Sequence, residues 1–167
     1  GWLSERELVY RRCEETGGTF FYASNFSLGV NLFFRLNKQL AALMNSFPEY
    51  QVSIREIHHA TKKDAPSGTA ITLAEAISEV VPSKSGWESG DTPVFDKIVI
   101  ASERTGNVPG IHTVVWESEN DIIEISHQAK NRKALALGAV VAAEYCMNHK
   151  GILTMNDLLK NKFPEYE

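Results

Sequence analysis

The sequence lacks several features that define large classes of proteins. Its 167 residues include only two cysteines, Cys13 and Cys146, a count that is ordinary for a reducing compartment. There is no cysteine pair with metal-ligand spacing and no His-Glu-x-x-His, so we expect no metal site. The Gly-x-x-x-x-Gly-Lys-Ser/Thr pattern is missing too, which excludes a nucleotide P-loop. We also find no apolar run of membrane length, signal peptide, repeat or low-complexity tract.

An excess of positive charge is also missing. With 17 basic and 21 acidic residues the net charge is −4, and the basic residues form only short groups such as Lys62-Lys63. We therefore expect neither nucleic acid nor a membrane as a partner, and we expect a cytoplasmic protein. At 43% hydrophobic residues, the chain can bury one good core, as a single domain with remnants of another.

The most informative stretch is Glu56–Ala70, which reads EIHHATKKDAPSGTA. It places two histidines, two lysines and a Ser-Gly-Thr turn within one short segment. Residues 50–57 before it alternate between apolar and polar, which is typical of a half-buried strand. We expect this strand to end near Ile57 or His58, because adjacent strand residues point to opposite faces and two neighbouring histidines could not otherwise meet one ligand.

The residues after this stretch predict a helix that begins near Gly68, capped by Asp64 or Ser67. A helix start exposes unpaired N–H groups and the positive end of the helix dipole, and both attract anions. A carboxylate held by Lys62 and by the N–H groups of Gly68 and Thr69 would lie near both imidazoles. The sequence therefore predicts a loop that binds a small anion and protonates it.

Each feature of this loop also has a purely structural interpretation. A single histidine beside a loop is more often a surface residue, a lysine pair is usually solvated, and Ser-Gly-Thr is usually only a helix cap. Their combination in one strand–loop–helix unit favours a functional site.

The remaining elements follow from periodicity and turn residues. Ser4 to Glu7 read as a capping box that starts a first helix, and residues 82–93 as a loop. The other elements are strands over residues 18–22, 95–102, 111–117 and 121–127, and helices over residues 26–47, 132–147 and 155–160. This order predicts an α+β fold, a mixed β-sheet with helices on one face. The strands lean apolar on both faces, which favours burial of the second face over a covering of loops.

The stretch Glu56–Ala70 resembles the signature of the dihydrodipicolinate reductase family, Glu-x-His-x-x-x-Lys-x-Asp-x-Pro-Ser-Gly-Thr-Ala. Residues 22–31 are similar to the family's crossover from the cofactor domain to the substrate domain. Residues 125–139 are similar to its closing strand and helix, although Lys130-Asn131 replace the usual Ser-Ser and Leu135 replaces a usual Phe.

By this resemblance, the enzyme reduces 4-hydroxy-tetrahydrodipicolinate with NADPH or NADH in diaminopimelate and lysine biosynthesis. The implied catalytic residues are His58, as proton donor, and Lys62, as its charged partner. The implied substrate-binding residues are His59, Lys62, Ser67, Gly68 and Thr69. The implied cofactor-binding residues are Ala23, Ser24, Asn25, Phe26 and Arg132.

The resemblance also implies a domain organisation. No Gly-x-Gly-x-x-Gly occurs, so we expect residues 1–25 to be the remnant of a Rossmann nucleotide-binding domain and the chain to be an inactive fragment of a longer enzyme. Residues 26–130 would form the substrate-binding and oligomerisation domain of a homotetramer, and residues 131–167 would be helices that pack back toward the nucleotide-binding domain. The alternative is a non-catalytic dicarboxylate-binding or oligomerisation module of the same fold. The pairing of His58 with Lys62 argues against it, because a binding module needs no proton donor.

Overall fold

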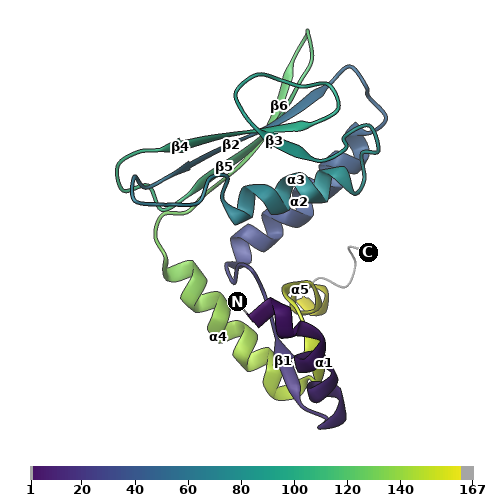
Figure 1. The fold of residues 1–167 in the computed structure, drawn as a ribbon, viewed down its shortest axis with the longest axis vertical. Coiled ribbons are helices and arrows are strands. Elements are labelled where there is room, and N and C mark those ends of the chain that lie inside the picture. The colour runs from purple at the N-terminus through teal and green to yellow at the C-terminus, as the bar shows by residue number, and fades with distance from the viewer. Residues whose placement is uncertain (1, 163–167) are drawn as a thin grey trace. The chain divides into compact units, whose positions relative to one another are not determined.

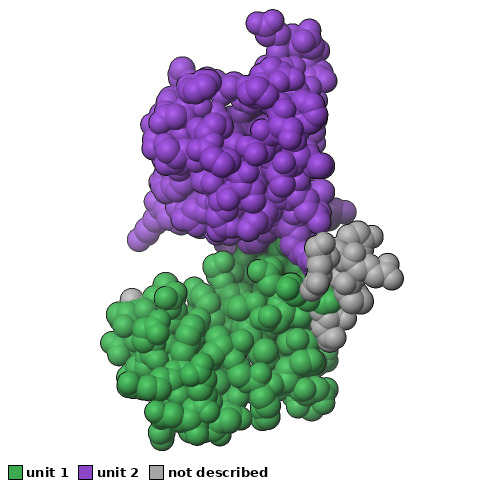
Figure 2. Space-filling model, turned by 90° about the vertical axis from the view of Figure 1, so that its right-hand side faces the viewer, with its two compact units in different colours: residues 1–31, 133–167 green, residues 32–132 purple. Residues whose placement is uncertain are grey.

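The computed structural model describes residues 2–162 and has the predicted α+β fold (Figure 1). The chain forms two compact units (Figure 2). Residues 1–31 and 133–167 belong to the first unit, and residues 32–132 form the second. None of the helices within residues 2–162 is long and apolar enough to cross a membrane.

The second unit is built on a five-stranded mixed sheet with the strand order β3-β4-β2-β5-β6. The strands are β2 (Gln51–His58), β3 (Trp87–Ser89), β4 (Ile98–Arg104), β5 (Ile111–Glu117) and β6 (Ile122–Gln128). Strand β2 runs parallel to β4 and antiparallel to β5, while β3 pairs in parallel with β4 and β6 antiparallel with β5. Because β2 is central, side chains at its carboxyl end have a paired strand on either side.

Helices α2 (Leu28–Met44) and α3 (Gly68–Ser78) contribute to the core on one face of this sheet, which confirms the prediction (Figure 1). The core residues from these helices and from the strands include Phe33, Ala41, Met44, Val52, Ile54, Leu73, Ile77, Ile100, Val114 and Trp116. In α3, the apolar residues recur at the helical spacing read from the sequence, and Leu73 is fully buried. Burial of one such side chain contributes about 1.5–3 kcal/mol, so this face fixes where α3 lies on the sheet.

The opposite face of the sheet is mixed in character. Val99 and Val115 are buried, but Arg55 and Glu124 are exposed and Thr113 donates to or accepts from a serine hydroxyl. This face therefore combines buried valines with polar side chains, and its burial in an assembly stays a prediction.

The first unit combines helices with a small parallel sheet. Its elements are the 3-10 helix Trp2–Glu5, α1 (Arg6–Glu15), β1 (Thr19–Phe21), α4 (Lys133–Asn148), β7 (Gly151–Leu153) and α5 (Met155–Lys162). Strands β1 and β7 pair in parallel, and Ala142, Leu158 and Leu159 are buried in the unit's core. A Cβ on Gly138 would lie 1.7 Å from the carbonyl oxygen of Phe26, so glycine is required where α4 meets this backbone.

The structure corrects the sequence prediction at three elements. Strand β3 lies inside the segment predicted to be a loop, and β7 was not predicted at all. Both have only three residues, too few for an alternating pattern to be visible. The first helix begins at Arg6 after a 3-10 turn, and its N-cap is Glu5 rather than Ser4, so the predicted capping box does not start it.

Candidate active site at the end of strand β2

Two polar side chains interrupt the buried face of β2. Val52 and Ile54 point into the core, and the same alternation places Glu56 and His58 on that face. Glu56 is 1% exposed and His58 is 8% exposed. A carboxylate this deeply buried is tolerated only when it is paired and hydrogen-bonded, so the end of β2 must carry a polar network.

Glu56 is the centre of this network. Its Oε1 accepts hydrogen bonds from Arg104 Nη2 at 2.7 Å and from the backbone N–H of Ser67 at 3.2 Å, and its Oε2 contacts His58 Nδ1. Burial by itself would raise the pKa of Glu56, but hydrogen bonds from Arg104 and Ser102 and the charge of His58 outweigh it. The pKa of Glu56 therefore lies below its ordinary value, and the group is a carboxylate at neutral pH.

Two histidines lie side by side in this network. The rings of His58 and His112 meet edge to face with centroids 5.0 Å apart, and His112 Nε2 lies 3.0 Å from Ser67 Oγ. Burial lowers the pKa of His58, against the raising effect of Glu56, and the charges of Lys62 and Arg104 lower it further. Burial, followed by the charge of His58, lowers the pKa of His112 to about 3. His112 is therefore a neutral ring that fixes the serine hydroxyl.

Strand β2 ends at His58 and α3 begins at Gly68, so the predicted strand–loop–helix unit is confirmed. Ser67 is the N-cap, because its Oγ accepts from the N–H of Ala70 at 3.2 Å. Its own N–H is taken by Glu56. Among the described residues this leaves the N–H groups of Gly68 and Thr69 without a protein acceptor at the positive end of the helix dipole.

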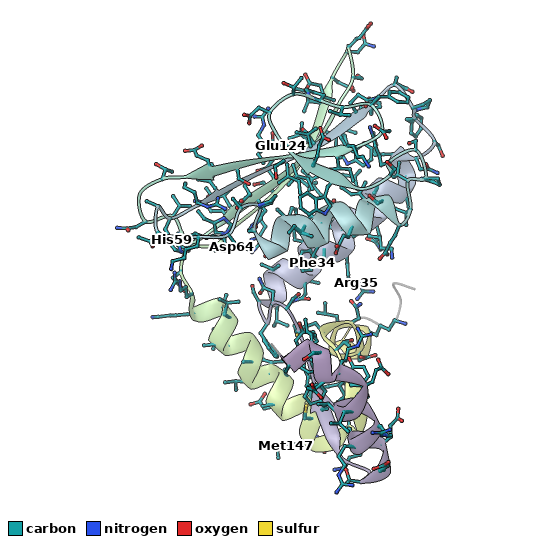
Figure 3. All side chains as sticks on the ribbon, viewed as in Figure 1. Phe34, Arg35, His59, Asp64, Glu124 and Met147 are labelled. Atoms are coloured by element: carbon teal, nitrogen blue, oxygen red, sulfur yellow. The ribbon has the colours of Figure 1, made fainter. Side chains whose placement is uncertain are left out.

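Asp64 does not cap the helix. Its carboxylate accepts two hydrogen bonds from Lys62 Nζ, both of 2.7 Å, which lower its pKa although burial opposes the shift. Its backbone oxygen accepts from Arg104 Nη2 at 2.6 Å. Figure 3 labels Asp64 and His59, which both belong to the loop between β2 and α3. The Asp64 side chain is 59% exposed and that of Lys62 is 20% exposed, so solvent partly screens this ion pair.

His59 belongs to a separate, basic pocket. Its Nδ1 lies 2.8 Å from Thr61 Oγ1, and its Nε2 lies 3.3 Å from Arg132 Nη2. The pocket has a volume of about 390 Å³ and is lined by His59, Thr61, Asn107, Pro109, Lys130, Asn131 and Arg132. It contains two cationic side chains and no acidic one, which suits an anionic group of a ligand.

The structure groups the predicted site residues differently from the sequence. His58, Ser67 and Glu56 share the buried network, while His59 and Arg132 share the basic pocket. Arg132, which was expected to bind the cofactor, thus lies beside His59, which was expected to bind substrate.

The other residues expected to bind the cofactor, Ala23 to Phe26, lie in the first unit. There the backbone N–H of Ser27 donates to Asn25 Oδ1 at 2.9 Å, and Asn31 Nδ2 donates to Asn25 O at 2.8 Å. These bonds connect Asn25 to the start of α2.

Sequence reasoning missed Arg104 and His112, and it did not assign a role to Glu56. A signal was present in the alternation of the strands. Glu56 continues the inward-facing series of β2, and His112 occupies an inward-facing position in β5, on the same face as Val114 and Trp116. A charged or titratable residue at a core position of a strand must have a buried partner and is therefore a candidate for a site.

Ligand atoms of Glu56, His58 and His112 all lie within 4.8 Å of one another, as in a metal centre. However, Glu56 already accepts hydrogen bonds from Arg104 and Ser67, and the guanidinium is a permanent positive charge at this point. The geometry therefore suits a hydrogen-bonded network better than a cation.

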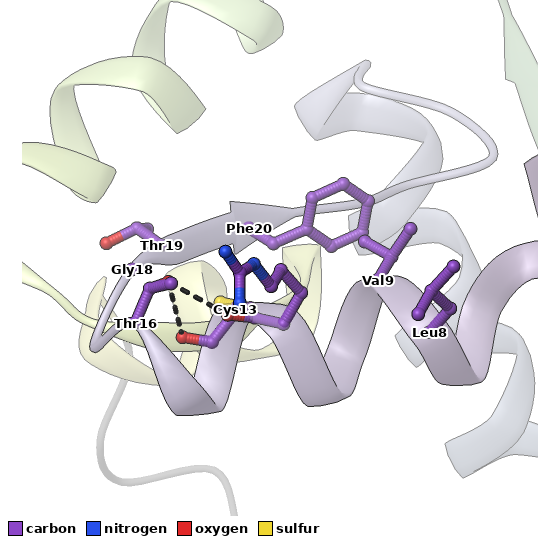
Figure 4. Close-up of a pocket in the computed structure, with 8 residues that line it drawn as sticks. Leu8, Val9, Cys13, Thr16, Gly18, Thr19 and Phe20 are labelled. Carbon is purple, nitrogen blue, oxygen red and sulfur yellow. Dashed lines mark hydrogen bonds between the residues drawn. The ribbon is translucent and has the colours of Figure 1, made fainter.

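A second depression, in the first unit, is less suited to chemistry. It has a volume of about 540 Å³, and its lining is mainly apolar (Figure 4). The hydroxyl of Thr16 is engaged with the backbone oxygens of Arg12 and Cys13. No cluster of titratable groups comparable to that at the end of β2 lies among these lining residues.

The comparison with known proteins matches this geometry to a family. A family model described as the C-terminus of dihydrodipicolinate reductase matches residues 29–159, which include the whole loop between β2 and α3. The chain belongs to the dihydrodipicolinate reductase family.

Two relatives are named 4-hydroxy-tetrahydrodipicolinate reductase. The one from Christiangramia forsetii is 51% identical over 163 residues, which cover 98% of this chain and 68% of the relative. The one from Caldanaerobacter subterraneus subsp. tengcongensis is 37% identical over 166 residues, which cover 95% of this chain and 64% of the relative. The chain thus spans about two thirds of the length of these two family members.

A solved structure of the family has the same fold. It is a dipicolinate-bound dihydrodipicolinate reductase from Paenisporosarcina sp. TG-14, with a TM-score of 0.67 and 26% sequence identity. The match covers 91% of this chain and 58% of that one.

Proposed function

We propose that this chain is the substrate-binding part of an enzyme that reduces 4-hydroxy-tetrahydrodipicolinate with NADPH or NADH. The observation that carries the proposal is a buried, hydrogen-bonded histidine, His58, at the end of a strand whose following loop carries two kinds of anion-binding group. In this proposal residues 26–130 bind substrate and mediate assembly, residues 1–25 belong to a nucleotide-binding domain, and residues 131–167 pack back toward that domain. The solved relative binds dipicolinate, a dicarboxylate of the same shape class, which supports this choice of substrate.

The two carboxylates of such a substrate have two sets of partners. One set is Lys62 with the N–H groups of Gly68 and Thr69, which combines a cation with the first turn of α3. The other is the pocket formed by His59 and Arg132. A helix start contributes about 0.3–1 kcal/mol toward a bound anion, and charge-assisted hydrogen bonds about 1.5–3 kcal/mol each, so these groups together can bind a small dicarboxylate.

The proton would come from His58. Burial lowers the pKa of the free His58, and a bound dicarboxylate would oppose this shift because its negative charge favours the imidazolium form. Binding of substrate therefore helps to load the donor with its proton. When bound, the nicotinamide cofactor supplies the hydride.

The described residues fit only part of that cofactor. The segment Ala23–Phe26, in which Asn25 is held by two hydrogen bonds, would contact the nicotinamide end, but the sequence contains no Gly-x-Gly-x-x-Gly turn for the pyrophosphate. The chain's own contribution is therefore to bind the substrate, orient it and hold the proton at His58.

Substrate binding can be tested on this chain by calorimetric titration with 2,6-pyridinedicarboxylate. We expect binding by the wild type and by Lys63→Ala, and loss of binding in Lys62→Ala. Lys63 is the matched control because it is the exposed neighbour of Lys62 on the same loop. Equal affinity in Lys62→Ala would show that the loop has only a structural role.

The catalytic roles are tested in the full-length enzyme. His58→Ala should depress kcat by about 10²–10⁴-fold, because the proton is transferred in the transition state. His59→Ala should act mainly by raising KM, because it removes a binding group. Identical kinetic effects of the two substitutions would refute this division of roles.

A further inference from the structure

The buried carboxylate of Glu56 does more than neutralise a charge inside the core. Its two oxygens have different partners. Oε1 accepts from Arg104 and from the Ser67 backbone, and Oε2 contacts Nδ1 of His58. Since a carboxylate can only accept hydrogen bonds, the proton in the contact with His58 must be on Nδ1.

Arg104 fixes the carboxylate from the neighbouring strand. Its Nη2 bridges Glu56 Oε1 and the backbone oxygen of Asp64, so it ties the end of β4 to the loop that follows β2. The Arg104 side chain is 18% exposed and that of Glu56 is 0% exposed, so neither group can move without breaking a buried ion pair. Glu56 is therefore held with one oxygen aimed at His58.

We infer that Glu56 and Arg104 form a positioning pair that keeps the neutral form of His58 protonated on Nδ1 and leaves Nε2 to exchange a proton with the ligand. The inference rests on the proposed function for the identity of that ligand, but the state of the ring is a property of this chain alone. The other charged or titratable groups that act on His58 are Lys62 from the loop, Arg104 from β4 and His112 from β5. Lys62 and Arg104 are cations and His112 is neutral, so among the described groups that act on His58 the anion is Glu56.

The space around Nε2 agrees with this assignment. Gly110 has φ +155°, and a Cβ at this position would lie 3.0 Å from His58 Nε2. The loop before β5 therefore approaches the reactive side of the ring closely, and the absence of a side chain there keeps that side clear.

Replacing Glu56 by glutamine gives a sharp expectation. Arg104 and the Ser67 N–H both require an acceptor at the Oε1 position, so the amide oxygen of the new side chain stays there and its NH₂ group faces His58 Nδ1. Nδ1 must then be the acceptor, and the proton of the neutral ring moves to Nε2. The substitution should therefore invert the tautomer while it preserves the shape of the core.

The experiment is a ring ¹⁵N NMR titration of this chain labelled at histidine. We expect neutral His58 to carry its proton on Nδ1 in the wild type and on Nε2 in Glu56→Gln. Glu103→Gln is the matched control and should leave the tautomer unchanged, because Glu103 is exposed and pairs with Ile57, on the opposite face of the sheet. Neutral His58 protonated on Nε2 in the wild type would overturn the inference without any variant, even if Glu56→Gln failed to fold.

Kinetic measurements on the full-length enzyme distinguish a positioning role of Glu56 from a purely structural one. Glu56→Gln should lower kcat at least about 10²-fold, and the loss of rate with rising pH should begin about one pH unit lower, because the imidazolium has lost its anionic partner. A purely structural role would lower the yield or stability and leave the pH profile in place. An inverted tautomer with wild-type kcat and pH profile would overturn the catalytic part of the inference. Full activity in His58→Ala would instead refute the proposed function, and the NMR result on Glu56 would stand.

Discussion

Acid should destabilise the unit formed by residues 32–132, and His112 should be a main cause. This histidine is 4% exposed and has a pKa of about 3 against an ordinary value of 6.5. The unfolded chain therefore binds a proton at this residue below pH 6.5, whereas the folded chain stays unprotonated there until about pH 3. Its contribution to stability is fully present above pH 6.5 and falls as the pH is lowered through this window.

The size of the effect follows from linkage. Each pH unit within the window costs about 1.4 kcal/mol, so at pH 4.5 His112 alone should remove roughly 2–3 kcal/mol from the free energy of unfolding. Because burial also lowers the pKa values of His58 and His127, these two histidines add to the loss in the same direction. A protein with a typical stability of about 5–15 kcal/mol should lose a large fraction of it.

The assay is urea unfolding at a series of pH values, followed by the fluorescence of Trp116, which is buried in the core of this unit. Trp2→Phe and Trp87→Phe make Trp116 the sole indole, since the sequence has three tryptophans. His112→Gln should have a lower free energy of unfolding than the wild type at pH 7.5. Between pH 7.5 and 4.5, however, its free energy of unfolding should fall by roughly 2–3 kcal/mol less than that of the wild type. His149→Gln, in the other compact unit, is the control. An unchanged pH dependence in His112→Gln would refute the reasoning.

Two further predictions concern the site and the assembly. Gly110→Ala should displace His58, because the new Cβ would lie 3.0 Å from His58 Nε2. In the full-length enzyme this substitution should therefore lower kcat at least about tenfold. A wild-type kcat would show that the His58 ring has room to move. The two helices that pack on the five-stranded sheet contribute to the core on one face, so we predict that the other face is covered by further copies in a homotetramer. Light scattering at micromolar concentration should then give four times the 18.6 kDa chain mass. Thr113→Arg, a substitution on that face, should lower the measured mass. A monomeric wild type would contradict the prediction.

The sequence alone determined the local structure around the loop. The two adjacent histidines indicate a strand end near Ile57 or His58, and helical spacing indicates a helix start near Gly68, because both signals come from near neighbours in the chain. The structure ends β2 at His58 and begins α3 at Gly68. Ser67 was predicted as one of two possible caps for the same reason. Short strands such as β3 could not be predicted, because three residues are held by their partner strand rather than by a pattern of their own.

Only the tertiary structure decided which residues share the site. Arg104 lies 48 residues after Glu56 and meets it because β4 pairs in parallel with β2. His112 reaches Ser67 because β5 pairs with the other edge of β2. His58 and His59 are adjacent in the chain, yet His58 enters the buried network beside Glu56 as the last residue of β2, while His59 lies in the loop beside Arg132 in the basic pocket. Periodicity specifies which face a side chain points to, but the partner on that face is set by strand order and register, and these depend on the whole sheet.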